Sequence, residues 1–256
     1  MSVAIERRAL GAIAFVDGAS GVRVADRLRV AGDGVHLTPN PSGLWVIRAA
    51  RGLESHASSF RAPPAEPPVE SLSFSLTVED PAGRYLPRSL TVRLPRSPAR
   101  AGEPGAALTP IVAPLLPAAA ALIRAGAAVL RVRVATAAGA PVSGALVRLT
   151  PEPPGLAPVL ALSDGDGEAI AILRDAPPFL PSIEAEAGIA PDFAAAVEVI
   201  VDREAARVDA PVLAVNPDRV LARLEEGAAG VTSTTAPPVR LGAGRTARAL
   251  ITVAAP

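Results

Sequence analysis

Residues 139–150 read Gly-Ala-Pro-Val-Ser-Gly-Ala-Leu-Val-Arg-Leu-Thr, and residues 163–168 read Ser-Asp-Gly-Asp-Gly-Glu. The first stretch opens with a Gly/Pro turn and continues into an apolar strand. The second is an Asp-Gly turn that leads into another apolar run, residues 169–173. Turn residues placed at the ends of short apolar runs are typical of strands joined by tight connections. These two stretches therefore predict a small module built from β-strands.

The same pattern extends over the whole chain. Short apolar runs, several of them with apolar residues at alternate positions, recur on both sides of a stretch rich in Pro and Ala, with turn signals between them, as in β-sandwiches. The runs lie at residues 22–30, 71–79, 90–94, 128–134, 159–162, 169–173, 197–201 and 247–253. We predict an all-β protein of two β-sandwich domains in tandem, residues 1–98 and 125–256, joined by a linker at 99–124.

The second domain is also expected to contain one short helix. Asn216 is placed to cap it, and Pro217 suits the first helical position. Val220, Leu221 and Leu224 then fall on one face before Gly227 ends the helix.

Composition excludes several classes of function. The formal net charge is zero, so long-range attraction to nucleic acid or to an anionic membrane is not expected. All basic residues are Arg, and they are scattered along the chain rather than clustered. The chain has no Cys, which rules out disulfides and thiolate chemistry and favours a cytoplasmic location.

Two apolar stretches have lengths compatible with a signal peptide or a membrane span, but other residues in or beside them argue against both. Residues 9–16 follow Arg7 and Arg8, but Glu6 is out of place in a signal peptide, so we expect a first strand there. Residues 104–123 are uncharged over 20 positions. They contain four prolines, which break helical hydrogen bonding, so we expect a linker and no membrane span.

Asp164, Asp166 and Glu168 place three carboxylates at alternating positions, which is compatible either with Ca²⁺ or with a bare turn. An EF-hand would need Gly at the sixth position and Glu at the twelfth, where the chain has Ala169 and Asp175. We favour a turn in which the glycines take positive φ and the carboxylates cap free N–H groups, with no metal and no cofactor.

We expect no enzymatic activity. His36 and His56 are the only imidazoles, and neither lies in a recognisable catalytic motif. His36 is expected on the polar side of a short strand, and His56 in a loop rich in hydroxyl groups.

The scarce large aromatics suggest two roles. Trp45 lies within an apolar run, which favours core packing. Arg84, Tyr85, Leu86 and Arg88 lie in a loop bounded by prolines, and they combine residue types that often anchor protein interfaces. We take these four as candidate interface residues and expect Tyr85 and Arg88 at the surface, although packing of Tyr85 on its own domain is equally compatible.

Residues 139–147 and 163–167 resemble the carboxypeptidase-regulatory-like domain, an immunoglobulin-like or prealbumin-like β-sandwich. The chain departs from that family after Leu173, at the proline-rich stretch 177–181. Residues 80–88 and 94–96 are similar to proteins encoded with contractile phage-tail-like injection systems in bacteria.

These resemblances imply a non-enzymatic structural or accessory component that contacts other protein subunits and is assembled in the cell. The alternative is a module that binds carbohydrate or a cell surface. The scarcity of aromatic residues counts against this alternative.

Overall fold

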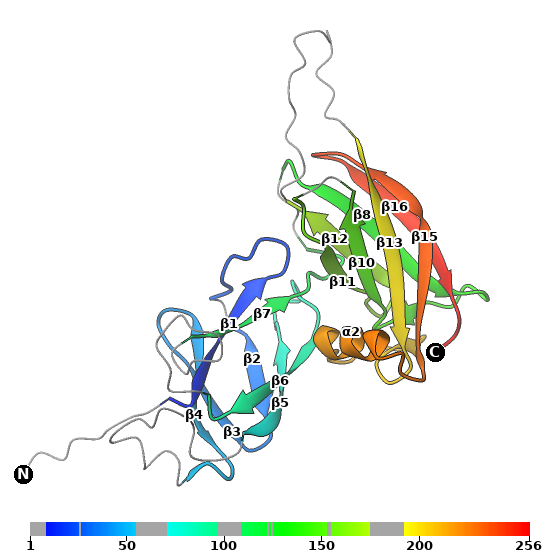
Figure 1. Ribbon diagram of the computed structural model, residues 1–256. Helices are drawn as coiled ribbons and strands as arrows, with labels where there is room; N and C mark the ends of the chain where they lie inside the picture. The colour runs from blue at the N-terminus through cyan, green and yellow to red at the C-terminus, as the bar shows by residue number, and fades with distance from the viewer. Residues whose placement is uncertain are drawn as a thin grey trace, which may run out of the picture. The chain divides into compact units, whose positions relative to one another are not determined.

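The computed structural model describes residues 9–25, 27–54, 71–96, 109–121, 123, 125–152, 155–174 and 192–256 (Figure 1). The described chain is mostly β-strand, which confirms the all-β prediction. It divides into two compact units. The first takes residues from Met1–Asp17, Gly21–Pro81 and Ser89–Pro114, and the second from Gly18–Ser20, Ala82–Arg88 and Leu115–Pro256.

The first unit contains two sheets. One has the strand order β3-β4-β1-β7, and the other has the order β2-β5-β6. The strands are β1 (Gly11–Asp17), β2 (Arg29–Gly32), β3 (Val35–Pro39), β4 (Leu44–Ala50), β5 (Leu72–Glu79), β6 (Arg88–Leu94) and β7 (Ile111–Leu115).

Alternation along the strands of the first unit buries one face, as the sequence predicted, but only in part. In β5, Leu76 and Val78 are fully buried, whereas Leu72 is 40% exposed and Phe74 is half-buried. Trp45 in β4 is also half-buried and does not belong to the fully buried core. The apolar period of β5 therefore continues beyond the part of the strand that is covered.

The boundary between the units differs from the predicted one. Ile111–Leu115 lies inside the stretch 99–124 that was predicted as a linker, yet it forms strand β7 beside β1. Ala113 and Leu115 are buried there, which explains why this apolar stretch is part of the fold. Residues 82–88, predicted in the first domain, belong to the second unit.

The second unit has two larger sheets and a short two-stranded one, with strand orders β11-β10-β13-β15, β12-β8-β16 and β14-β9. Strand β16 runs parallel to β8, whereas the pairs β10–β11, β10–β13, β12–β8, β13–β15 and β14–β9 are antiparallel. The strands are β8 (Ala128–Thr136), β9 (Val142–Ser143), β10 (Leu146–Pro151), β11 (Val159–Leu162), β12 (Glu168–Leu173), β13 (Phe193–Asp202), β14 (Arg207–Val208), β15 (Val231–Leu241) and β16 (Thr246–Val253).

Side chains from both large sheets form one apolar core in the second unit. Val132 of β8 and Ile251 of β16 pack in the same cluster as Val147, Leu149 and Val197 from β10 and β13. Four of these side chains are fully buried, and Ile251 is 4% exposed. The strand of the opening sequence stretch, β10, is thus an inner strand of its sheet and contributes to the core of the second unit (Figure 1).

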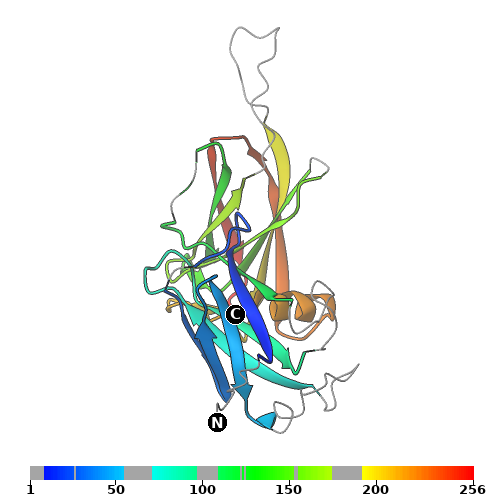
Figure 2. The same ribbon diagram turned by 90° about the vertical axis from the view of Figure 1, so that its left-hand side faces the viewer.

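The helix α2 (Pro217–Glu225) forms as the capping residues predicted. The side chain of Asn216 accepts the N–H of Arg219 over 3.2 Å, and Gly227 takes a φ of +65° just after the helix. Figures 1 and 2 both show α2 beside β15. Within the described ranges, no helix combines the length and the apolar character needed to cross a membrane.

Candidate functional site

The segment 84–88, predicted as a contact loop, is hydrogen-bonded into the second unit. The N–H of Leu86 donates to the carbonyl of Leu116 over 3.0 Å. The N–H of Ala118 donates to the carbonyl of Arg84 over 2.9 Å. Two backbone bonds in opposite directions hold the segment like a short piece of sheet. Its backbone is therefore part of the scaffold.

Only some of the four candidate side chains in this segment are accessible. The Arg84 guanidinium lies 5.7 Å from the ring centre of Tyr85, at the range of a cation–π contact, and both residues are half-buried. Leu86 is 8% exposed and packs in an apolar cluster with Leu146 and Val220. Most of the predicted contact surface is thus used for internal packing.

Arg88 is 5% exposed, so the expectation that it lies at the surface is wrong. Its Nη2 atom donates to Oδ2 of Asp218 over 2.7 Å, and the Asp218 side chain is 74% exposed. Burial lowers the pKa of the Arg88 guanidinium, while the charge and hydrogen bond of Asp218 raise it. An arginine remains protonated at neutral pH despite such a shift, so Arg88 is a buried cation beside the first turn of α2.

We expect Asp218→Ala to lower the free energy of unfolding by about 1–2 kcal/mol, because a buried cation loses its carboxylate partner. The loss is kept small by the exposure of Asp218, since solvent screens the pair. Urea denaturation of the full chain gives the value. Glu225→Ala removes an exposed carboxylate from the same helix and should change stability by less than about 0.5 kcal/mol. Equal losses for the two variants would contradict the assignment.

The Asp-Gly turn is closed by its own carboxylate. Oδ1 of Asp164 accepts the N–H of Asp166 over 3.0 Å and the N–H of Glu168 over 2.9 Å. Gly167 takes a φ of +74°, whereas Gly165 does not take a positive φ. The carboxylate of Asp164 thus caps N–H groups of the turn, as the sequence predicted. In the part of the chain that the structure describes, no three acidic or imidazole side chains are grouped to hold a metal ion.

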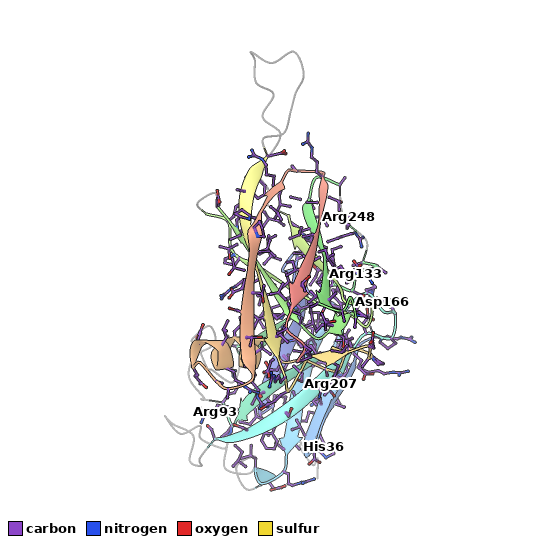
Figure 3. All side chains as sticks on the ribbon, turned by 90° about the vertical axis from the view of Figure 1, so that its right-hand side faces the viewer. His36, Arg93, Arg133, Asp166, Arg207 and Arg248 are labelled. Atoms are coloured by element: carbon purple, nitrogen blue, oxygen red, sulfur yellow. The ribbon has the colours of Figure 1, made fainter. Side chains whose placement is uncertain are left out.

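Of the two histidines, His36 lies among the described residues. His36 is exposed on β3, as the sequence predicted for the polar side of a short strand (Figure 3). His56 lies outside the described residues.

Arginine side chains gather on the outer face of the sheet β12-β8-β16. A pocket of about 320 Å³ is lined by Arg131 and Arg133 of β8, Glu168 of β12, and Arg248 and Ala249 of β16. We call it the arginine pocket. Figure 3 views the side of the second unit on which Arg133 and Arg248 lie. Three cations and one carboxylate give it a formal charge of +2, in a chain whose net charge is zero.

Strand register explains how these side chains come together. The parallel pairing of β16 with β8 sets Arg248 opposite Arg131. The antiparallel pairing of β12 with β8 sets Glu168 opposite Arg133. Like charges directly opposite each other on adjacent strands destabilise a sheet. The Arg131–Arg248 pair therefore destabilises the sheet locally. Proteins often retain such unfavourable pairs at functional sites.

The charges of the arginine pocket are mostly left for solvent or a ligand. Nη1 of Arg131 donates to the carbonyl of Ala119 over 2.9 Å, which steadies this one side chain. Among the described residues, no ion pair joins Arg133, Arg248 or Glu168 to another side chain. The pocket can therefore bind an anion without first breaking a salt bridge.

A second pocket, of about 330 Å³, lies in the first unit. It is lined by Asp33, Gly34, Arg51 and residues 73–75. Nη2 of Arg51 is 3.2 Å from Oδ1 of Asp33, so the cation of this pocket is already paired with an acid. It offers a weaker site for a charged ligand than the arginine pocket does.

The arginine pocket was not among the sites predicted from the sequence. Its local signal was the alternation of Arg131 and Arg133 with apolar residues, which marks the polar face of a strand. Arg248 comes from the last strand of the unit, and only the parallel pairing brings it beside β8. Arginines that are scattered in the sequence are thus clustered in space.

The comparisons with known proteins add no family to these observations. No protein-family model, no curated protein and no solved structure matches the chain.

Proposed function

We propose that this chain is a non-enzymatic structural or accessory component that acts by contact with other protein subunits of a larger assembly. The proposed setting is a contractile particle related to phage tails, as the resemblance of residues 80–88 and 94–96 suggests. We further propose that both units are immunoglobulin-like sandwiches. The observation that carries the contact function is the charged outer face of the sheet β12-β8-β16.

This face has the properties of a protein contact surface. Its side chains stand on strands of a packed sheet, which fixes their positions better than a loop would. Arginine is enriched in the energetically important parts of interfaces. Leu250 of β16 lies opposite Arg133 and is 69% exposed, so an apolar side chain stands beside the charges. We therefore place the contact surface on this face and not at residues 84–88.

The alternative, a module that binds carbohydrate or a cell surface, also finds one supporting observation. An arginine pocket that includes Glu168 offers both donors and an acceptor, which suits an acidic sugar. Stacking on sugar rings would need exposed aromatics. None of the described aromatic residues is exposed, since Phe15 and Phe193 are buried and Trp45, Phe74 and Tyr85 are half-buried. Protein contact is the function that we favour.

The proposal predicts that the chain sediments with particles that contain sheath and tube proteins when it is expressed with a tag in its source organism. Reversal of the charge at Arg131, Arg133 and Arg248 to Glu should lower the tagged chain in the particle fraction at least tenfold, about 1.4 kcal/mol. Quantitative immunoblotting of sedimented and free fractions measures this ratio.

A matched control variant distinguishes the effect of changing this face from the effect of changing the net charge of the chain. Arg29, Arg93 and Arg240 are exposed and have no ion-pair partner among the described residues, and changing all three to Glu alters the net charge equally. The control should stay with the particles. Wild-type chain that never sediments with such particles would refute the setting. Equal loss in both variants would refute the assigned surface.

A further inference from the structure

We infer that the arginine pocket binds two carboxylates of an extended acidic segment in a protein partner, with acidic residues at positions i and i+2. The inference rests on the proposed function, because it names the chemistry of the partner that would occupy the proposed contact face. It is carried by the charge of the pocket, by the register of β8 and β16, and by the exposed Leu250.

The charge of the pocket sets how much negative charge its occupant needs. Three guanidinium groups against one carboxylate leave an excess of two positive charges. An occupant with two carboxylates neutralises this excess. A polyphosphate chain such as nucleic acid fits less well, because Glu168 lies within the pocket and would repel closely spaced phosphates.

The register sets where the two carboxylates would lie. Arg131 and Arg248 are directly opposite on neighbouring strands, which places their backbones about 5 Å apart. A carboxylate between the two guanidiniums can accept hydrogen bonds from both and removes their mutual repulsion. This is the first of the two positions, and the bond from Arg131 to the carbonyl of Ala119 orients one of its donors.

The second carboxylate position is at Arg133. Arg133 is two residues beyond Arg131 on the same face of β8, which is a displacement of about 7 Å along the strand. An extended peptide repeats its side chains on one face at the same interval of two residues. Acidic residues at i and i+2 of an extended segment therefore match the two positions, whereas adjacent acidic residues would point to opposite faces.

Leu250 and Glu168 complete the recognition surface on either side of Arg133. Leu250 is opposite Arg133 on β16 and can cover an apolar side chain of the partner. Glu168 is opposite Arg133 on β12 and competes with the second carboxylate for that guanidinium. Removal of the charge of Glu168 should therefore strengthen the binding of an acidic segment, which a purely structural role of this residue would not do.

The test uses the full chain and fluorescein-labelled peptides of equal length in an extended, proline-flanked frame. The first peptide has a centre that reads glutamate, valine, glutamate. The second replaces both glutamates by glutamine. The third has the order glutamate, glutamate, valine, so its charge is the same but its spacing differs. Fluorescence anisotropy gives Kd at two salt concentrations. We expect the first peptide to bind at least tenfold more tightly than the second and at least threefold more tightly than the third.

Substitutions in the protein test where the peptide binds. Arg131→Gln and Arg248→Gln should each raise the Kd of the first peptide at least fivefold, whereas Arg240→Gln on β15 should leave it unchanged. Glu168→Gln should lower the Kd at least twofold. Circular dichroism and thermal melting of each variant show that the fold is kept. Because Arg248→Gln removes a like-charge contact, this variant should melt no lower than the wild type.

Several results would overturn the inference. Equal binding of the first and third peptides, or an equal loss in Arg240→Gln, would mean general charge attraction only. Tighter binding of an oligosaccharide of uronic acids than of the first peptide would assign the pocket to acidic sugar. If no peptide binds but charge reversal still releases the chain from particles, the inferred acidic partner segment is wrong, whereas the proposed contact face is supported. If the first peptide binds as expected but charge reversal leaves particle association unchanged, the proposed role of this face in particle contact is wrong.

Discussion

Gly167→Ala should lower the free energy of unfolding of the second unit by about 2–5 kcal/mol. Gly167 has a φ of +74°, a conformation that costs a residue with a Cβ atom about 1–2 kcal/mol. An added Cβ would also lie 2.4 Å from the carbonyl oxygen of Val134 and 3.2 Å from Cβ of Pro141. The nearest neighbour is backbone of strand β8, which cannot move without disturbing the sheet, so the overlap should cost about 1–3 kcal/mol more.

A second glycine separates strain from overlap. Gly139 also has a positive φ, +83°, but nothing lies within 4 Å of the Cβ that Ala would add. Gly139→Ala should therefore cost only the conformational term, about 1–2 kcal/mol. Urea denaturation monitored by circular dichroism gives both values. If the two variants lose the same stability, the close approach of the Asp-Gly turn to Val134 is wrong.

Leu149→Ala should be comparably damaging, with a loss of about 3–4 kcal/mol in the free energy of unfolding. Leu149 is fully buried in β10, where its register partners are Val159 of β11 and Val197 of β13. Truncation removes apolar contacts and leaves a cavity between sheets that are held by their own hydrogen bonds and cannot fully close it. The melting temperature of the second unit should fall by at least several degrees.

The control for this prediction is Leu250→Ala in the same unit. Leu250 is 69% exposed, so the same chemical change removes little buried area and should cost less than about 0.5 kcal/mol. A loss above 2 kcal/mol for Leu250→Ala would show that the outer face of β16 is covered in the folded chain. That outcome would also remove the basis for its use as a contact surface.

The predictions made from short-range pattern were the ones that the structure reproduced best. The Asn216–Pro217 start and the Gly227 end of α2 depend on side chains and backbone within one helical turn. The capping of the Asp-Gly turn by Asp164 is equally local. The alternation that marks β6 and β8 is also local, since it records which face of each strand is buried.

The predictions that failed depend on partners far away in the sequence. The proline-bounded loop 84–88 looked exposed from its composition, but the chain uses Leu86 and Arg88 for packing against residues near α2. The stretch around β7 looked like a linker because its prolines suit an extended chain. An extended backbone is also found in edge strands. Sequence pattern alone does not distinguish a linker from an edge strand, because the difference is whether the segment pairs with a neighbouring strand.

By itself, the sequence determined that this protein is built from β-strands, where most of its turns fall and where its helix begins and ends, because those features follow from backbone preferences and side-chain period. Only the tertiary structure decided that the first and last strands of the second unit lie side by side in parallel. Strand pairing is set by how the apolar faces of distant segments are buried together, and many pairings satisfy the same local pattern. The arginine pocket depends on that pairing, since Arg248 meets Arg131 only in this register.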